Sequence, residues 1–265
     1  MNFSKKLLAA CILLALSINL FAKEQKELLF YIGITMVKPI DELAKNFEKM
    51  HNCKIKILQG GSKDLYDSLK MSQVGDLYFP GSLSYRKENL KEGLLLEGVF
   101  VGFNKMALVV KKGNPKNIKA SLDELTRQDL RVVLGNASSG SVGNATKKIL
   151  SRYGNFQEAM LNAIFLSPDS RTLTHSLIKD DADIILNWYA TAFWDNNSKL
   201  VEPLILSEKD APKAMLVLNL LQTSKHKELV RLFMQYASSK EGQEVFYKYG
   251  FLDDEDRKNF DKISF

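Results

Sequence analysis

Residues 134–150 have the sequence LGNASSGSVGNATKKIL, and this stretch decides how the chain can fold. It continues the run RVVL at 131–134, so it predicts a strand, a turn rich in glycine and serine, and an amphipathic helix that begins near Ser141. The start of a helix exposes unpaired backbone N–H groups at the positive end of the helix dipole, which is a site for anions. Turns of this composition also occur as simple connections, so the rest of the sequence must show whether this one is an anion site.

The order of strand, short polar turn and helix recurs along the chain. Residues 27–33 predict a strand and 37–50 a helix, and the pattern is repeated by a strand at 54–59 and a helix at 63–71. The further predicted strands are 75–80, 106–110, 163–166, 182–188, 201–206 and 214–220, and the further helices 121–124, 171–179, 225–237 and 238–249. Such alternation favours an α/β fold with parallel, doubly wound sheets, and 265 residues are enough for two lobes.

Four of the turns join a strand to a helix with the same kinds of residue. They lie at Thr35, at Ser62, at 138–143 and at Asp169–Ser170. In open α/β sheets, ligands bind beyond the carboxyl ends of the strands. If two such sheets face each other, the four helix starts meet in one cleft, which is suited to a small anion and consists mostly of neutral hydrogen-bond donors.

The first residues do not belong to this fold. Lys5 and Lys6 precede the apolar run 7–21, which ends at Ala22 before a polar segment. This pattern predicts a secretory signal peptide over 1–22, because the apolar run is too short for a convincing membrane span.

The two cysteines indicate a chain without an internal disulfide. The segment LAAC at 8–11 resembles a lipoprotein cleavage box, which would leave a lipid anchor on Cys11. The box lies near the start of the apolar run, so cleavage after Ala22 is the preferred interpretation. Cys53 is then the one cysteine of the mature chain, and its place beside the strand 54–58 predicts a small buried side chain.

Charge and histidine spacing exclude two classes of function. Without the two lysines of the leader, 37 basic residues become 35, against 31 acidic ones. This surplus is spread along the chain, apart from an acidic run at 253–256, whereas nucleic-acid binding requires a clustered basic stripe. His51, His175 and His226 lie far apart and lack ligand spacing, so neither a metal site nor a cofactor is expected.

Seven segments, taken in order, resemble the periplasmic molybdate-binding proteins of ABC importers. They are FYIGITM at 30–36, GGSKDLYDSL at 60–69, GDLYFPGS at 75–82, RVVLGNASSGSVGNATKKIL at 131–150, SPDSRTL at 167–173, ADIILNW at 182–188 and EVFYKYGF at 244–251. The similarity extends from about Leu28 to Phe251, and it lies in the order and spacing of the segments more than in any one of them.

The resemblance implies a set of ligand-binding residues in the first three turns. The family's two hydroxyl ligands fall on Thr35 and Ser62. Its backbone donor at the third helix start falls on Val142, with Ser141 and Gly143 on either side.

The same resemblance implies a fourth helix start and an aromatic position. Ser170 matches a further main-chain donor. From its position alone, Arg171 after it could either reach the anion or be a solvated helix residue. The family's tyrosine falls on Trp188, or on Tyr189 if the register shifts by one residue. An indole N–H can donate a hydrogen bond but is not a phenol, so the aromatic position departs from the family pattern.

The family fold has two α/β lobes joined by two crossing strands, the architecture of type II periplasmic binding proteins, and it closes on its ligand like a hinge. The crossings are expected at 106–111 and 214–220. Lobe 1 is then 23–106 plus 217–265, and lobe 2 is 107–216. The implied protein is a monomeric periplasmic receptor that passes a small oxyanion, molybdate or tungstate first, to an inner-membrane ABC permease.

A second hypothesis is a receptor for a small phosphorylated or carboxylic acid. The segments KGNPKNIKASLDEL at 112–125 and ADIILNW at 182–188 also look like a related branch of receptors for such metabolites. Lys38, Lys63 and Arg171 could serve a larger anion of this kind.

A third hypothesis is a secreted serine hydrolase that uses Ser62 or Ser141 with His175 and Asp169. Neither serine lies in a nucleophile elbow, so an enzyme is not expected. Asp169 and Asp64 are instead expected as N-cap or first-turn residues of their helices.

Overall fold

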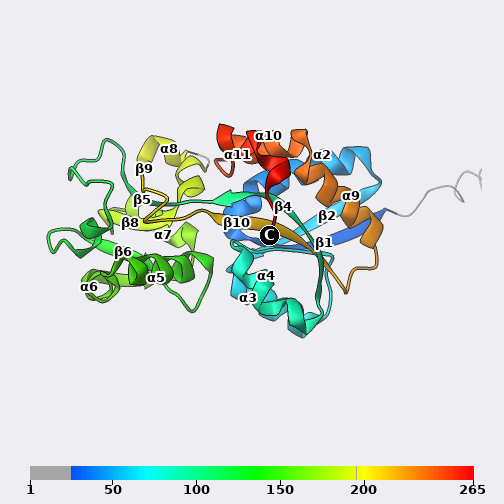
Figure 1. Ribbon diagram of the computed structural model, residues 1–265, viewed down its shortest axis with the longest axis horizontal. Coiled ribbons are helices and arrows are strands. Elements are labelled where there is room, and N and C mark those ends of the chain that lie inside the picture. Colours follow the sequence, from blue (N-terminus) through cyan, green and yellow to red (C-terminus); the bar gives the residue numbers. More distant parts are fainter. Residues whose placement is uncertain (1–24, 195) are drawn as a thin grey trace, which may run out of the picture.

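The computed structural model describes residues 25–194 and 196–265, so the expected signal peptide at 1–22 and Cys11 lie outside the described residues. The described chain forms two α/β lobes, each built on a five-stranded mixed sheet with helices packed on it (Figure 1). Within those residues, no helix combines the length and the apolar character needed to span a membrane.

Lobe 1 is built on a sheet with the strand order β2-β1-β3-β10-β4. The strands β1 (Lys26–Gly33), β2 (Cys53–Gly60) and β3 (Leu77–Phe79) are parallel to one another. Strand β10 (Ala214–Leu221) lies antiparallel between β3 and β4 (Leu95–Asn104). The sheet is therefore mixed, and one of its inner strands comes from near the end of the chain.

Helices cover both faces of this sheet. On one face α2 (Val37–Met50), α9 (Lys227–Ser238) and α10 (Lys240–Lys248) enclose the largest apolar core. On the other face α3 (Ser62–Ser72) and α4 (Leu83–Asn89) pack over a smaller core. The predicted burial of Cys53 is confirmed, since its side chain is 1% exposed.

Lobe 2 is built on a sheet with the order β7-β6-β8-β5-β9. Strands β6 (Val132–Gly135), β7 (Ala163–Ser167) and β8 (Ile184–Trp188) are parallel. Strand β5 (Met106–Lys111) runs antiparallel to β8 and to β9 (Val201–Ile205). This sheet is mixed as well, rather than purely parallel.

Three helices of lobe 2 share one apolar core with its sheet: α5 (Ser141–Tyr153), α6 (Phe156–Asn162) and α7 (Ser170–Ile178). The short elements are η1 (Ile34–Met36), η2 (Leu90–Glu92), η3 (Leu122–Thr126), η4 (Tyr189–Phe193), α8 (Asn197–Leu200), α11 (Asp254–Lys258) and η5 (Phe260–Lys262). The strand, turn and helix predicted over residues 131–150 are confirmed as β6 and α5.

Two connections join the lobes, and they differ slightly from the expected crossings. Met106 already pairs with Trp188 in lobe 2, so Lys105 is the first connection, and residues 206–213 form the second. Residues 214–216 pair with β4, so they belong to lobe 1 rather than to lobe 2. The apolar runs on either side of each connection do not show in which sheet a strand finds its hydrogen-bonded neighbour.

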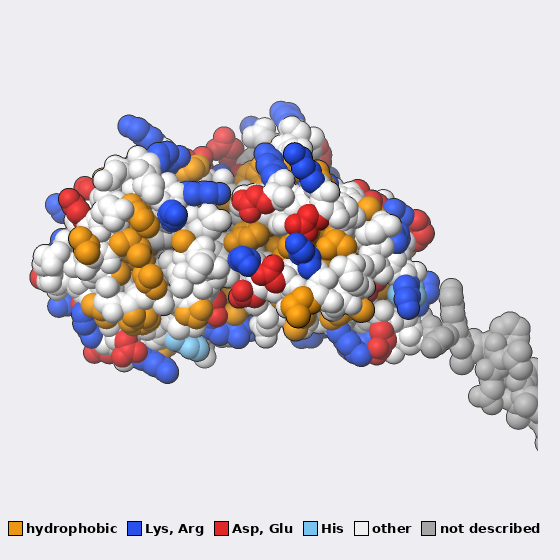
Figure 2. Space-filling view, turned by 90° about the horizontal axis from the view of Figure 1, so that it is seen from below, with side chains coloured by type: hydrophobic (Ala, Val, Ile, Leu, Met, Phe, Trp, Pro, Cys, Tyr) orange, Lys and Arg blue, Asp and Glu red, His pale blue; other side chains and the backbone are white. Residues whose placement is uncertain are grey.

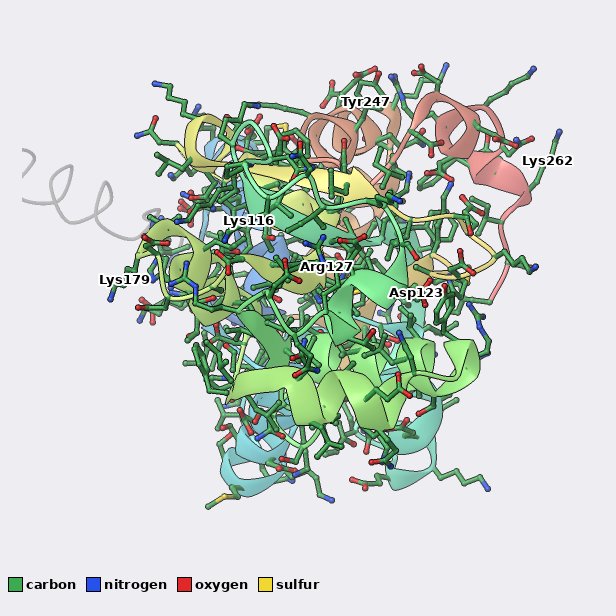
Figure 3. The ribbon with its side chains drawn as sticks, turned by 90° about the vertical axis from the view of Figure 1, so that its left-hand side faces the viewer. Lys116, Asp123, Arg127, Lys179, Tyr247 and Lys262 are labelled. Carbon is green, nitrogen blue, oxygen red and sulfur yellow. The ribbon has the colours of Figure 1, made fainter. Side chains whose placement is uncertain are left out.

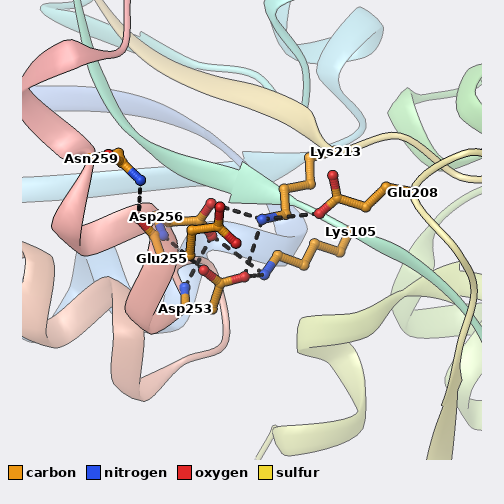
Figure 4. Close-up of polar contacts among 7 residues, drawn as sticks. All are labelled: Lys105, Glu208, Lys213, Asp253, Glu255, Asp256 and Asn259. Carbon is orange, nitrogen blue, oxygen red and sulfur yellow. Dashed lines mark hydrogen bonds and ion pairs between the residues drawn. The ribbon is translucent and has the colours of Figure 1, made fainter.

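An ionic cluster ties both connections to the C-terminal helix α11 (Figure 4). Lys105 Nζ lies 2.5 Å from Asp253 Oδ2, and Lys213 Nζ lies 2.8 Å from Asp256 Oδ1 and 3.1 Å from Asp253 Oδ2. Asp253 and Asp256 also form a capping box at the start of α11. We call Lys105, Lys213, Asp253 and Asp256 the hinge cluster.

Ionisation of Asp253 and Lys213 is shifted toward the charged forms. Burial alone would raise the pKa of Asp253, but hydrogen bonds from Lys105, from the Asp256 backbone and from Lys213 outweigh it and hold that pKa below its usual range. Burial alone would lower the pKa of Lys213, yet hydrogen bonds to Asp256, Asp253 and Glu208 raise it. Both groups therefore stay charged across the neutral range.

Surface charges are mixed in sign. Basic and acidic side chains are interspersed over the face in Figure 2, and they do not gather into one stripe there. Figure 3 shows the outer end of lobe 2, where Asp123, Arg127 and Lys116 lie on the surface. Arg127 pairs there with Glu124 and Asp129, each at 2.7 Å.

Candidate functional site

Four helix starts, two from each lobe, face one small cavity between the lobes. From lobe 1, η1 follows β1 and brings Thr35, and α3 follows β2 and brings Ser62. From lobe 2, α5 brings Ser141 and Val142, and α7 brings Ser170. The cavity has a volume of about 10 Å³, on the scale that holds one small polar group. We call it the anion cavity.

Three of the four helix starts lack a side-chain cap. Gly33, Gly61 and Gly140 occupy the N-cap positions of η1, α3 and α5, and a glycine offers no oxygen to the first N–H groups. At α7 the carboxylate of Asp169 accepts a hydrogen bond of 2.8 Å from the Thr172 N–H, as its predicted N-cap role requires. A bound anion would supply the acceptors that the three glycines leave out.

The hydroxyl groups add donors beside these N–H groups. Thr35, Ser62 and Ser170 are each 2% exposed. Ser62 Oγ accepts the Gly81 N–H at 3.0 Å, which leaves its own proton free to be donated. Among the described residues, none forms a hydrogen bond with the Thr35 hydroxyl. The two hydroxyls can therefore both donate to one small acceptor.

Fixed partners hold the helix starts in place. Asn187 Nδ2 donates to Ser170 O at 2.9 Å, and Tyr78 Oη donates to Ser62 O at 2.8 Å. Asn104 Nδ2 donates to Gly81 O at 2.9 Å, so the loop that binds Ser62 is itself held. Sequence reasoning missed Gly81 and Asn104, although the Pro-Gly break at 80–81 was a signal that the chain turns there.

The anion cavity contains almost no charge. None of its described lining residues is Lys, Arg or His, and Asp169 is the one acidic residue among them. Asp64, the other carboxylate considered from the sequence, lies in the first turn of α3, as predicted. Any attraction for an anion would therefore come from backbone and hydroxyl dipoles rather than from a counter-charge among these residues.

Backbone atoms of the two lobes approach each other closely beside this cavity. A Cβ atom added at Gly61 would lie 2.6 Å from the Ser139 carbonyl oxygen, and one added at Gly140 would lie 3.5 Å from Gly61 Cα. Gly61 has φ −64° and ψ 143°, a region open to any residue, so its lack of a side chain matters for the contact and not for its own backbone. The structure thus shows the two lobes in contact beside the cavity.

Arg171 lies beside the anion cavity rather than in it. It lines a neighbouring cavity of about 150 Å³, and its Nη2 donates to Gln59 Oε1 of lobe 1 at 3.1 Å. Gly143 is buried at the start of α5, where any Cβ would overlap the backbone of Asn136. Gly143 is therefore required by the packing of α5 against the preceding turn.

The two aromatic residues also lie outside the anion cavity. Trp188 is 1% exposed and lines a second cavity of about 180 Å³, which shares Ser141 with the anion cavity. Tyr189 lines a groove of about 560 Å³ that includes Lys105 and Lys213 of the hinge cluster. A resemblance in sequence aligns positions, but it does not show toward which side of the strand end a side chain turns.

The constellation considered for a hydrolase is not assembled. His175 lines the same cavity as Arg171, apart from Ser62 and Ser141, and the carboxylate of Asp169 caps α7. Residues 25–194 and 196–265 contain no cluster of three or more His, Cys, Asp and Glu side chains that could hold a metal ion.

Residues 28–252 match the family model of the bacterial extracellular solute-binding proteins. The chain belongs to this family. It is also 21% identical over 248 residues to a candidate binding protein of Haemophilus influenzae, and the match covers 94% of this chain and 98% of that protein.

Solved structures of periplasmic binding proteins share the fold. The sulfate-binding protein SubI of Mycobacterium tuberculosis superposes with a TM-score of 0.75 at 16% identity, covering 89% of this chain and 91% of that one. The periplasmic molybdate-binding protein of Azotobacter vinelandii gives 0.70 at 14%, with 85% and 99% covered. Campylobacter jejuni PEB3, solved with L-phospholactate bound, gives 0.67 at 18%, again with 85% and 99% covered. At such identities the similarity establishes the type II binding-protein fold alone.

Proposed function

We propose that this solute-binding protein captures a tetrahedral oxyanion in the periplasm and delivers it to an inner-membrane ABC permease. One observation carries the proposal: four helix starts surround a small cavity whose described lining offers donors and no basic side chain. The proposed ligands are the hydroxyls of Thr35 and Ser62 and the main-chain donors around Ser141, Val142 and Ser170.

Neutral donors suit an anion that offers only acceptors. Each hydrogen bond to a charged partner contributes about 1.5–3 kcal/mol, so six or seven of them could supply roughly 10–12 kcal/mol after ordering costs, which corresponds to nanomolar affinity. The described lining residues provide no counter-charge. An anion can still be stabilised there, because the N–H dipoles of several helix starts and the hydroxyl groups each interact with part of its negative charge.

Molybdate and tungstate are the first ions to test. Both are doubly charged and carry no proton at neutral pH, so they need no acceptor from the protein. Phosphate keeps a proton near neutral pH, and Asp169 is the acidic group at the cavity that could accept it. The resemblance of the motif segments to molybdate-binding proteins supports the same order.

Calorimetry on the purified mature chain, residues 23–265, tests the proposal. We expect at least one of molybdate, tungstate, sulfate and phosphate to bind with a dissociation constant below about 1 µM. The same ion should raise the melting temperature in proportion to the logarithm of its concentration. If none of the four produces heat or a thermal shift, the oxyanion proposal is wrong.

A further inference from the structure

The edge strand β7 of lobe 2 leaves a run of apolar side chains exposed. Ile164, Phe165 and Leu166 are each at least 39% exposed, and Leu161 at the end of α6 is 87% exposed. Hydrophobic side chains also gather on lobe 2 in the left-hand part of Figure 2. Successive side chains of a strand point to opposite faces, so neither face of β7 is fully covered. Three consecutive exposed apolar residues in a strand indicate a contact surface.

The outer side of β7 is also open to main-chain pairing. The strand stands at the end of the sheet order and, within the described part of the chain, pairs only with β6. No turn or loop of residues 25–194 and 196–265 forms a backbone hydrogen bond with residues 164–166. An edge strand in this state presents N–H and C=O groups to which a further strand can be added.

The other three sheet edges carry features that oppose the addition of a strand. Exposed Lys54 and Lys56 alternate along β2, and Pro203 lies in the middle of β9. On β4 the N–H of Phe103 donates to the carbonyl of Phe251 at 2.7 Å, so part of that edge is already covered. Lysine, proline and covering loops are the usual protection of edge strands.

Strand β7 has none of this protection. Its sequence AIFLS contains no charge and no proline, and the whole segment 159–168 is free of charged residues. A neutral apolar edge is suited to meet its own copy. About a two-fold axis a residue on the axis faces itself, so that a charge there would face a like charge.

The position of β7 in the molecule also permits such a pairing. Ser170, just beyond the carboxyl end of β7, lines the anion cavity between the lobes, so this end of the strand points toward lobe 1. Antiparallel pairing of two β7 strands therefore places the two copies of lobe 1 at opposite ends of the assembly, where they do not collide.

We propose that two copies of this chain associate through β7, in antiparallel register about a two-fold axis at Phe165. Phe165 then faces its own counterpart, Ile164 faces the counterpart of Leu166, and the two five-stranded sheets become one sheet of ten strands. The contact is shorter than a standard protein interface, so we expect a dissociation constant of about 1–100 µM. The inference is independent of the proposed oxyanion site, and it replaces the monomer that the family resemblance implies.

Sedimentation velocity on residues 23–265 over about 1 to 200 µM tests the proposal. We expect a concentration-dependent change from monomer to dimer. Phe165→Lys and Phe165→Glu should each weaken association at least about 10-fold, because like charges then face each other. An equimolar mixture of these two variants should dimerise again, since opposite charges meet. Leu58→Lys is the matched control, because Leu58 is 43% exposed on the edge strand β2 and should leave the dimer unchanged.

A disulfide trap tests the register without relying on the charged variants. Residues directly opposite in an antiparallel pair have Cβ atoms about 4.5–5.5 Å apart, close to the span of a disulfide. Phe165→Cys should therefore form a covalent dimer under mild oxidation, seen on a non-reducing gel. Leu58→Cys is the control and should stay monomeric. The natural Cys53 is 1% exposed and does not interfere.

Three results would overturn the inference. If the wild type stays monomeric at the highest concentration and Phe165→Cys traps no dimer, the edge of β7 receives another occupant, such as the permease. If the wild type dimerises and Phe165→Lys dimerises equally well, the copies meet on another surface. If the mixture of the two charged variants stays monomeric while both keep the melting temperature of the wild type, the two copies of residue 165 do not meet.

Discussion

The hinge cluster and the anion cavity are built from different kinds of polar group: paired full charges in the first, and neutral hydrogen-bond donors in the second. The hinge cluster joins full charges of both signs, and it fastens Lys105 and Lys213 to α11. The anion cavity has no cation among its described lining residues, so the proposed anion would have to be bound by helix starts and hydroxyls. Breaking a buried ion pair by removing one partner is costly, whereas under the proposed function many neutral donors could separate from a solute as the lobes move apart.

A substitution at Gly61, where the two lobes touch, is expected to have the largest effect on oxyanion binding. In Gly61→Val the side chain would overlap the Ser139 carbonyl and keep the lobes apart, so we expect oxyanion affinity to fall about 1000-fold with little change in unfolding of the ligand-free protein. Gly60→Ala is the control, because a Cβ at Gly60 meets Leu65 at an ordinary 3.5 Å. Calorimetry measures both, and equal affinities would show that closure at Gly61 is not needed.

Removing a cation from the hinge cluster has the next largest expected effect. Lys213→Met leaves Asp256, whose side chain is 7% exposed, without its closest cation, so we expect the free energy of unfolding in urea to fall by roughly 3 kcal/mol. Lys45→Met, which breaks an exposed pair with Asp41, is the control and should change little. Similar losses in both variants would contradict the structural role of the hinge cluster.

Two substitutions at Ser141, the first residue of α5, can distinguish the contribution of its hydroxyl from that of its backbone N–H. Ser141→Ala removes only the hydroxyl, while Ser141→Pro also removes the N–H at a position where a helix tolerates proline. Gly140 before it is already extended, as a residue preceding proline should be. We expect the proline variant to bind molybdate about 10-fold more weakly than the alanine variant. Equal affinities would mean that this N–H does not contact the ion.

The smallest expected effect is that of pH on affinity, since the described lining of the anion cavity contains no Lys, Arg or His. We expect molybdate affinity to change less than about twofold between pH 6 and 9 in calorimetry. A steeper pH dependence would show that an ionisable group controls the site.

The hinge cluster should lose its contribution to stability only outside this range. Because the pKa of Asp253 is lowered by folding, its contribution is complete above the unfolded value near 4 and disappears as the pH falls toward the folded value. The pKa of Lys213 is raised, so its contribution is complete below about 10.4 and disappears as the pH rises beyond that value. Unfolding free energies of wild type and Lys213→Met should therefore differ by a constant amount from pH 6 to 9.

Local patterns predicted much of the fold and of the site geometry. Each of the four turns was read from a strand, a small polar residue and a helix within about 20 residues, and the structure places all four around one cavity. Whether these residues bind a ligand stays a prediction. Strand β4 was not predicted, because Gly98 and Gly102 interrupt its apolar alternation. In the structure its pairing with β10 contains two shifts in register.

Features that depend on distant residues were not predictable. The ion pair between Lys105 and Asp253 joins positions 148 residues apart, and no local pattern indicates it. The direction of the Trp188 side chain depends on how the end of β8 packs into the core of lobe 2. These are consequences of tertiary packing, which periodicity along the chain does not record.

The position of β10 in the sheet of lobe 1 also determines which of the two sheets can finish folding first. All five strands of lobe 2 lie within the continuous segment 106–205, so its sheet needs nothing from the rest of the chain. Strand β10 lies between β3 and β4 yet follows all of lobe 2 along the chain, so the first sheet stays divided until residue 221 is available. The strands of lobe 2 pair within a shorter stretch of chain, which favours the earlier folding of lobe 2. Lobe 1, which carries Thr35 and Ser62, would then complete its half of the cavity last.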